Sequence, residues 1–252
     1  MTQDMTLLWG SGSPPCWRVL IALEEKNLQG YNSVLLSFEK GEHKSQQIAL
    51  EEKNLQGYNS VLLSFEKGEH KSQQVLDINP RGQLPSFKHG DRILNESYGV
   101  CSYLESQFKN QGNKLIPECG AEQARMYQRM YEGQTLAQKM ADVIYYNWKV
   151  PEGERHDSAV KRNREALIAE LKIWEEYLKK GPGPYLAGKD FTLADVTVYP
   201  SIAYLFRFGL CEKRHPKVAE YYNSLKSRPS IKATWPPTWL ESPQGQDLLK
   251  DI

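Results

Sequence analysis

Residues 83–104 read QLPSFKHGDRILNESYGVCSYL, and this stretch carries the clearest secondary-structure signals of the chain. Residues 84–87 predict a strand entered through Pro85, which has no N–H to donate to a neighbouring strand. Residues 88–91 have the composition of a tight turn, and residues 92–94 predict a second strand antiparallel to the first. The stretch therefore predicts a hairpin that leads directly into a helix.

The helix is expected to open at Glu96 and Ser97, because Val100, Tyr103 and Leu104 recur at helical spacing after them. A carboxylate, a hydroxyl and free backbone N–H groups would then meet at one helix N-terminus. Such a terminus can hold a small molecule that carries both a carboxylate and an ammonium group. The alternative is an ordinary capped hairpin and helix with no ligand.

Composition excludes several classes of function. The 252 residues include 25% charged residues with a formal net charge of +1, which offers no basic surplus for nucleic acid. Apolar runs are too short to span a bilayer, and the N-terminus does not read as a signal peptide. Cys16, Cys101, Cys119 and Cys211 fit no zinc spacing, so no metal is expected and the cytoplasm is the simplest location.

The chain contains one exact internal repeat. Residues 21–47 and residues 48–74 are identical letter for letter. A solenoid needs about three or more units, so two identical units within a non-repeating chain indicate a tandem duplication. The sequence does not say whether the duplication is natural or engineered.

With one copy set aside, the chain predicts two domains. A strand at 6–9, a helix at 16–27 and a strand at 31–38 imply a parallel pair with a right-handed crossover. Together with the hairpin and its helix they form an α/β domain over residues 1–108. After a linker, helical periodicity predicts an all-α domain over residues 118–252.

The helical domain has its own start signal. Thr192 and Asp195 have the spacing of a capping box, and Phe191 can act as the hydrophobic staple before it. Long helices are also expected at about 159–180 and 216–227.

The order of the domains and five short motifs resemble the cytosolic glutathione transferases. The motifs are SPPCWR at 13–18, NP at 79–80, QLP at 83–85, ES at 96–97 and FTLAD at 191–195. The Ser-x-Pro-Cys pattern is similar to the serine-type theta and zeta branch, and the match is closest to the fish rho class. The resemblance implies a thioredoxin-like first domain, an all-helical second domain and a homodimer.

The resemblance implies that Ser13 is the catalytic residue. Glutathione reacts as a thiolate, and its thiol, with an ordinary pKa near ~8.5, needs a hydroxyl donor and a helix N-terminus to ionise at neutral pH. Ser11 is the second candidate hydroxyl, and Ser13 could instead be only an N-cap. Cys16 could be a nucleophile, although no Cys-x-x-Cys motif is present, while Cys101 and Cys211 are expected in the core.

The remaining glutathione contacts also follow from the resemblance. The backbone at Gln83, Leu84 and a cis Pro85 would hold the cysteinyl part, and Glu96 and Ser97 would hold the γ-glutamyl part. A histidine and a lysine of the repeated Gly-Glu-His-Lys loop would face the glycyl carboxylate, unless that loop is a solvated turn. Arg81 is expected at the surface without a role.

Because the two copies of the repeat are identical, the sequence does not decide which copy supplies the second strand and the histidine and lysine of the glycyl site. If the extra segment leaves the fold at 28–30, the second strand comes from 58–65. If the segment leaves near 39–47, the strand comes from 31–38. We favour His70 and Lys71 over His43 and Lys44 for the glycyl site, and we expect a lower melting temperature than that of a chain with one copy deleted.

Hydrophobic electrophiles would bind in an aromatic pocket, although each candidate residue could simply be core. The candidates are Tyr127, Met130, Tyr131, Gln134, Trp148, Phe206 and Phe208. The predicted activity is conjugation of glutathione to small hydrophobic electrophiles. A non-catalytic glutathione-binding module and a zeta-type glutathione-dependent isomerase are the alternatives, and neither a membrane nor a nucleic acid is an expected partner.

Overall fold

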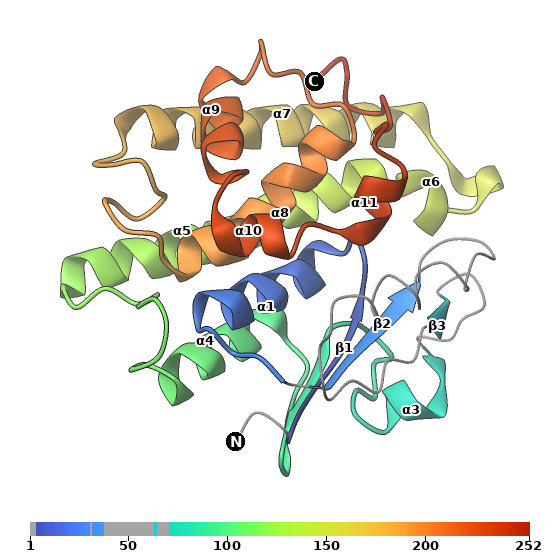
Figure 1. Cartoon of the computed structure of the whole chain (residues 1–252). Coiled ribbons are helices and arrows are strands. Elements are labelled where there is room, and N and C mark those ends of the chain that lie inside the picture. The colour runs from blue at the N-terminus through green and yellow to red at the C-terminus, as the bar shows by residue number, and fades with distance from the viewer. Residues whose placement is uncertain (1–3, 31, 38–62, 65–70) are drawn as a thin grey trace. The chain divides into compact units, whose positions relative to one another are not determined.

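The computed structural model describes residues 4–30, 32–37, 63–64 and 71–252 (Figure 1). The chain divides into two compact units. The first unit comprises Met1–Asn113 and Ala233–Glu241, and the second comprises Lys114–Lys232 and Ser242–Ile252. Among the described residues, no helix is both long and apolar enough to cross a membrane.

The first unit is built on a five-stranded sheet with the order β3-β2-β1-β4-β5. Its strands are β1 (Met5–Gly10), β2 (Asn32–Ser37), β3 (Leu63–Ser64), β4 (Ser86–His89) and β5 (Arg92–Leu94). β1 and β2 are parallel, whereas β4 is antiparallel to both β1 and β5. The predicted parallel pair and the predicted hairpin are therefore confirmed.

The two copies of the repeat contribute adjacent strands. β2 comes from the first copy, as in the expected arrangement that takes the second strand from 31–38. That arrangement also expected the second strand copy to lie outside the fold, which is wrong for Leu63 and Ser64, because they form β3 of the sheet. β3 comes from the second copy and pairs parallel with β2, with Leu36 opposite Leu63 and Ser37 opposite Ser64. Each of these residues therefore lies beside the corresponding residue of the other copy. β3 was not predicted from the sequence. His43, Lys44 and His70 lie outside the described residues.

Helices α1 (Pro14–Glu25) and α4 (Ser97–Gln107) pack against each other in the first unit. α1 begins two residues earlier than the predicted 16–27 and carries prolines at its first positions, where a missing N–H costs little. Just after α1, the buried Lys26 ammonium lies 2.8 Å from the Glu105 carboxylate of α4. This pair fixes the end of α1 against α4.

The described part of the first unit also contains two short helices. α3 (Gln73–Leu76) precedes β4 in the sequence, and α11 (Pro237–Glu241) lies near the C-terminus of the chain. The sequence placed residues 233–241 with the helical domain, but they cluster with the first unit. The domain bounds 1–108 and 118–252 otherwise remain a prediction.

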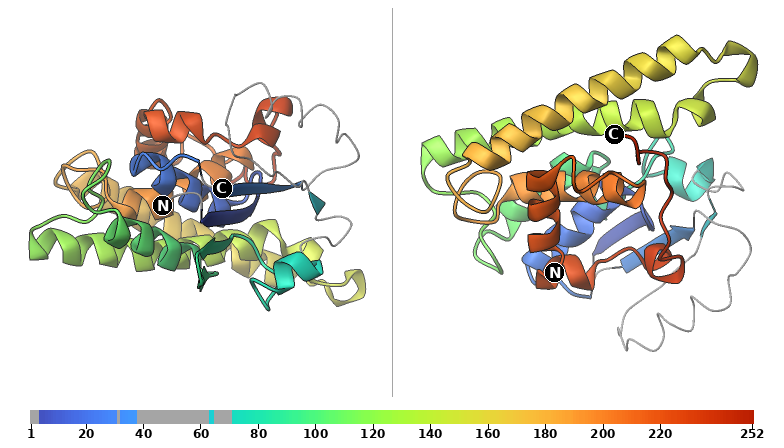
Figure 2. Two further views of the ribbon diagram at one scale, coloured as in Figure 1. Left: turned by 60° about the horizontal axis from the view of Figure 1, so that its bottom comes forward. Right: turned by 90° about the horizontal axis from the view of Figure 1, so that it is seen from above.

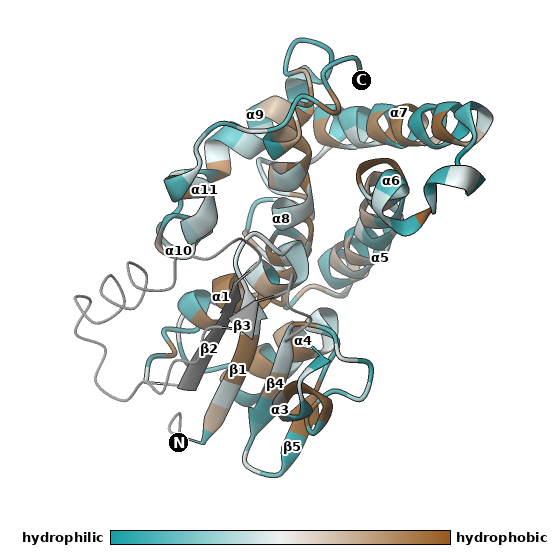
Figure 3. Cartoon of the chain, turned by 90° about the vertical axis from the view of Figure 1, so that its right-hand side faces the viewer, coloured by the Kyte–Doolittle hydropathy of each residue, from teal (hydrophilic) through white to brown (hydrophobic). Residues whose placement is uncertain are grey.

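Every element that the structure describes in the second unit is helical. Its two long helices, α5 (Gly120–Ile144) and α7 (Asp157–Lys180), lie side by side (Figure 2). Polar and apolar residues alternate along both (Figure 3), as expected for helices with one buried face. The other helices are α6 (Tyr146–Lys149), a 3-10 turn (Glu152–Glu154), α8 (Leu193–Arg207), α9 (Pro216–Leu225) and α10 (Pro229–Ala233), which ends at the boundary.

The N-terminus of α8 confirms the predicted capping box. Thr192 Oγ1 accepts from the Ala194 N–H at 3.2 Å, and the Thr192 N–H donates to Asp195 Oδ2 at 2.9 Å. Asp195 is fully buried and also accepts from the Leu186 N–H and the Tyr221 hydroxyl, both at 3.0 Å. Burial raises the pKa of Asp195 to about 6, against the lowering effect of these hydrogen bonds.

Candidate active site

The loop between β1 and α1 presents Ser13 at the start of the helix. Ser13 is the N-cap residue of α1, with extended backbone, yet its side chain makes no capping hydrogen bond. Pro15 at the N2 position has no N–H, so of the two donors that an N-cap hydroxyl ordinarily accepts from, only the Cys16 N–H at N3 remains. The half-buried Ser13 hydroxyl therefore does not cap the helix.

Cys16 lies one turn into α1 and has no solvent exposure. Burial raises the pKa of its thiol to about 11, although the side-chain hydrogen bond between Cys16 and Ser13 and the hydrogen bond from the Gly10 N–H act in the opposite direction. Cys16 is therefore a thiol at neutral pH and is poorly suited to be a nucleophile. A neutral Cys16 thiol can also donate its S–H to Ser13 Oγ, and in that arrangement the hydroxyl proton of Ser13 can be donated to a ligand.

Ser11, the second candidate hydroxyl, is turned away into the protein. Its side chain is 4% exposed, and its Oγ lies 2.8 Å from Thr238 Oγ1. The Thr238 N–H donates to the same Ser11 Oγ at 3.1 Å. The geometry thus favours Ser13 over Ser11 as the hydroxyl that can meet a ligand.

The other cysteines offer no further site. Cys101 is buried in α4 as expected, and burial raises the pKa of its thiol to about 12. Cys211 is half-buried, so placing it in the core was wrong, and Cys119 is exposed. Within the described part of the chain, no group of three or more His, Cys, Asp or Glu side chains is arranged to hold a metal ion.

The peptide bond between Leu84 and Pro85 is cis, as predicted. Ser86 pairs with Leu8 in the antiparallel register of β4 and β1. Pro85 therefore lies toward the Gly10 end of β1, where the loop to Ser13 begins. The cis bond and the Ser13 loop consequently share one edge of the sheet.

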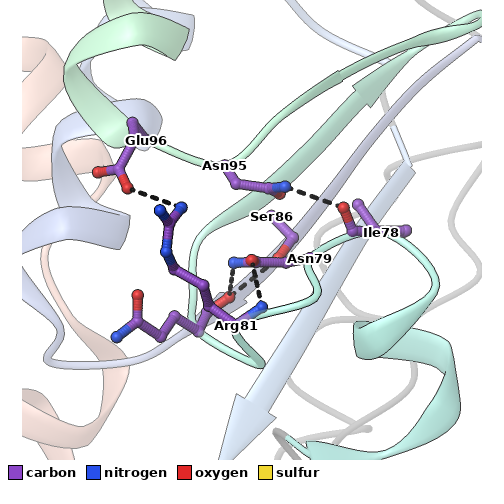
Figure 4. Close-up of polar contacts among 7 residues, drawn as sticks. Ile78, Asn79, Arg81, Ser86, Asn95 and Glu96 are labelled. Carbon is purple, nitrogen blue, oxygen red and sulfur yellow. Dashed lines mark hydrogen bonds and ion pairs between the residues drawn. The ribbon is translucent and has the colours of Figure 1, made fainter.

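Asn79 organises the chain just before this cis bond. Its side chain is 1% exposed and its Nδ2 donates to the Gln83 carbonyl at 2.7 Å, while its Oδ1 accepts from the Arg81 N–H at 3.1 Å (Figure 4). Ser86 Oγ donates to the same Gln83 carbonyl at 3.0 Å. The sequence analysis missed this role, although the Asn-Pro pair was among the motifs.

The N-terminus of α4 forms an anion-binding arrangement. Ser97 is 5% exposed, and its Oγ accepts from Arg18 Nη1 of α1 at 3.2 Å. Arg18 is itself buried, with its Cζ 4.8 Å from the centre of the Tyr98 ring. Because a guanidinium can only donate, the bond with Arg18 does not use the hydroxyl proton of Ser97. The first N–H groups of the helix add to the positive potential.

The Glu96 carboxylate stands beside this terminus and is 78% exposed. Arg81 is also exposed, as expected, but its guanidinium lies 3.8 Å from Glu96 Oε1 (Figure 4). Lys71 Nζ donates to the Arg81 carbonyl at 2.7 Å. The structure thus connects the predicted residues Lys71 and Glu96 through Arg81, a residue to which the sequence assigned no role.

The predicted electrophile residues of the second unit occupy different environments. Met130 is buried, Phe206 and Phe208 are partly buried, and the exposed ones are Tyr127, Tyr131, Gln134 and Trp148. The alternative that each candidate is simply a core residue is therefore wrong for the four exposed ones. Phe206 stacks on Tyr222 with ring centres 4.6 Å apart, which places it against α9.

An aromatic row connects two of these residues through two that the sequence missed. Trp148 lies 6.0 Å from the Tyr145 ring, and the Tyr145 and Tyr204 hydroxyls are 2.7 Å apart. The Tyr204 ring lies 4.7 Å from that of Phe208. The aromatic run at 145–148 was the signal that could have identified Tyr145.

Comparison with known proteins gives one consistent result. A family model described as "Glutathione S-transferase, N-terminal domain" matches residues 12–107, and one described as "Glutathione S-transferase, C-terminal domain" matches residues 135–240. "Glutathione S-transferase A" of Pleuronectes platessa is 68% identical over 252 residues, which cover 100% of both chains.

Solved structures agree with the sequence matches. A glutathione S-transferase from the Antarctic clam Laternula elliptica has a TM-score of 0.77 and 33% identity, over 99% of this chain and 100% of that one. Glutathione transferase URE2P6 of Phanerochaete chrysosporium, in complex with oxidized glutathione, has a TM-score of 0.70 and 25% identity, over 92% and 94%. The matches confirm the predicted fold, a thioredoxin-like domain followed by an all-helical domain.

Proposed function

This chain belongs to the glutathione S-transferase family, and we propose that Ser13 donates a hydrogen bond to the glutathione thiolate as it attacks a hydrophobic electrophile. The observation that carries the proposal is the Ser13 hydroxyl, which heads α1 without capping it and shares a sheet edge with the cis Leu84–Pro85 bond. A donor beside a helix N-terminus stabilises an anionic sulfur and lowers the pKa of the thiol.

The rest of the first unit would bind the non-reacting parts of glutathione. The Leu84 backbone, before cis Pro85 and after Gln83, would pair with the cysteinyl part, as the family resemblance implies. Ser97 and the α4 N-terminus would hold the γ-glutamyl carboxylate, and Glu96 would hold the ammonium. Lys71 would face the glycyl carboxylate, with His70 and Ser11 as the remaining sequence-based assignments.

The second unit would supply the electrophile pocket. We assign it to the aromatic row, because apolar walls with a few polar groups suit bulky electrophiles and the paired hydroxyls of Tyr145 and Tyr204 supply such polar groups. Trp148, which is 80% exposed, and Phe208 form the two ends of that row. The other sequence-based candidates are Tyr127, Met130, Tyr131, Gln134 and Phe206.

The class of glutathione transferase to which we assign the chain is inferred from the sequence alone. The Ser-x-Pro-Cys pattern at 13–16 supports a serine-type enzyme close to the fish rho class. A homodimer in the cytoplasm with a role in detoxification follows from the family resemblance. The exact repeat of 21–47 supports a recent tandem duplication.

The experiment that tests the function combines two measurements on the full chain. We expect retention on immobilised glutathione and turnover of an aryl halide with glutathione. Retention without turnover of aryl halides or of isomerase substrates would support the non-catalytic binding module instead. Turnover of a small cis enone or dienone acid with no aryl-halide activity would support the isomerase.

A further inference from the structure

A segment near the C-terminus, residues 233–241, packs on the loop that carries Ser13. This segment is the part of the first unit that lies farthest along the sequence, and 227 residues separate the bonded pair Ser11 and Thr238. Thr238 contacts Ser11 twice, through its Oγ1 at 2.8 Å and its N–H at 3.1 Å. Both side chains are buried, at 4% and 7% exposure.

Gly12, the next residue of the loop, packs closely against residues 233–241. Gly12 has a φ of +76°, which favours glycine, and a Cβ there would lie 3.0 Å from Trp239 Nε1 and 3.4 Å from Thr238 Oγ1. The Ser13 N–H then donates back to the Gly10 carbonyl at 3.3 Å. Contacts with Thr238 and Trp239 thus fix Ser11 and Gly12, the two residues directly before Ser13.

An indole cluster anchors the segment to α1. Trp17 packs edge-on against Trp235 and Trp239 with ring centres 5.2 and 5.5 Å apart, and those two rings are 5.8 Å apart. Trp17 Nε1 donates to Thr234 Oγ1 at 2.8 Å. Buried aromatic pairs of this kind add to the energy of apolar burial. The indole contacts and the hydrogen bonds of Thr234 and Thr238 therefore hold the segment against α1 and the Ser13 loop.

We propose that Thr238 is a positioning residue for Ser13. Thr238 fixes the Ser11 hydroxyl and, with Trp239, the backbone at Gly12, so it determines where the Ser13 hydroxyl points. The inference rests on the catalytic role proposed for Ser13. A displaced donor would stabilise the thiolate less, whereas the binding of the distant parts of glutathione would not change.

Thr238→Val tests the inference, because valine has nearly the same shape and keeps the backbone N–H but removes Oγ1. We expect kcat to fall about 10-fold, within the ~10²-fold cost of a misplaced reacting group, with glutathione KM little changed. The apparent pKa in the pH dependence of kcat should rise. Thr238→Ser, which keeps the hydroxyl, should restore both quantities.

Thr234→Val is the matched control, since it removes the other threonine hydroxyl of the segment and leaves the loop contacts in place. It should keep the wild-type kcat and pH profile even if it lowers the melting temperature. The inference is overturned if Thr238→Val keeps the wild-type kcat and pH profile, or if Thr234→Val produces the same shift. Ser13→Ala, assayed in parallel, separates the two proposals, because wild-type turnover there would contradict the function itself.

Discussion

Helix α8 and helices α1 and α4 begin with similar sequence signals, but their N-termini differ in structure. At α8, the side chains of Thr192 and Asp195 close the helix start completely, and Asp195 is fully buried. At α1 and α4, the N-cap residues Ser13 and Glu96 make no capping hydrogen bond from their side chains. We call the first a closed cap and the other two open caps.

The difference separates stability from function. A closed cap uses its polar groups within the protein, so it stabilises the fold and leaves nothing for a ligand. An open cap forgoes part of that stabilisation and keeps a hydroxyl or carboxylate available beside the positive end of a helix. A polar residue at a helix start therefore indicates a ligand site only when the structure shows that its side chain does not cap the helix.

The largest effect is expected at the open cap of α1. Ser13→Ala should keep the fold and glutathione binding and lower kcat/KM by roughly 10–1000-fold, the range for loss of one positioned donor. Steady-state kinetics with glutathione and an aryl halide measure this. Ser11→Ala is the comparison variant, and a larger loss there than in Ser13→Ala would contradict the assignment.

At the closed cap of α8, a substitution should lower stability and leave activity unchanged. Asp195→Ala leaves buried donors at Leu186, Thr192 and Tyr221 without their acceptor, so the free energy of unfolding should fall by about 1–3 kcal/mol. Activity per folded molecule should not change. Denaturant unfolding and active-site titration measure the two quantities, with the exposed Asp190→Ala as control. A loss of kcat in the folded fraction would break the distinction between the caps.

The open cap of α4 should affect substrate binding. Ser97→Ala should raise the glutathione KM by about 10-fold, the size expected for a hydrogen bond to a charged group, and leave the electrophile KM nearly unchanged. Glu96→Ala should have a smaller effect in the same direction, because its carboxylate is exposed and screened by solvent. Equal increases in both KM values would indicate damage to the first unit instead of a lost contact.

The smallest effect is a pH dependence of stability at the closed cap. The pKa of Asp195 is raised to about 6 in the folded protein, so the folded state binds its proton more tightly than the unfolded state. The stability contributed by that proton is present below about pH 4 and is lost as the pH rises through about 6. Unfolding free energies of wild type and Asp195→Asn should therefore diverge across this window, and a constant difference would show that Asp195 does not titrate there.

Local patterns predicted most of the fold. Pro85, the turn at 88–91 and the periodicity after Glu96 gave β4, β5 and α4 within about two residues, because these signals act over a few neighbouring positions. The packing of residues 233–241 on the first unit could not be predicted, since it depends on contacts between residues more than two hundred positions apart. The two identical copies also contribute strands at different places in the sheet, β2 beside β1 and β3 beside β2.

The sequence predicted which residues form the candidate site, but it did not predict which other residues they contact. Ser13, Ser97 and cis Pro85 carry recognisable motifs, and the structure gives each a physical setting. The engagement of Ser11 by Thr238 and the approach of Arg81 to Glu96 left no sequence signal, because both depend on tertiary geometry. Ser11 is buried against Thr238, whereas Ser13 is half-buried, and this difference depends on a residue far away in the sequence.

The pKa of the glutathione thiol bound to the protein tests the open cap of α1 most directly. The ultraviolet absorbance of the thiolate, titrated against pH with saturating glutathione, reports this pKa for wild type and Ser13→Ala. We expect a wild-type value clearly below the ~8.5 of a free thiol and a value in Ser13→Ala that returns most of the way toward it. The same lowered pKa in both proteins would contradict the assignment of Ser13 as the donor to the sulfur.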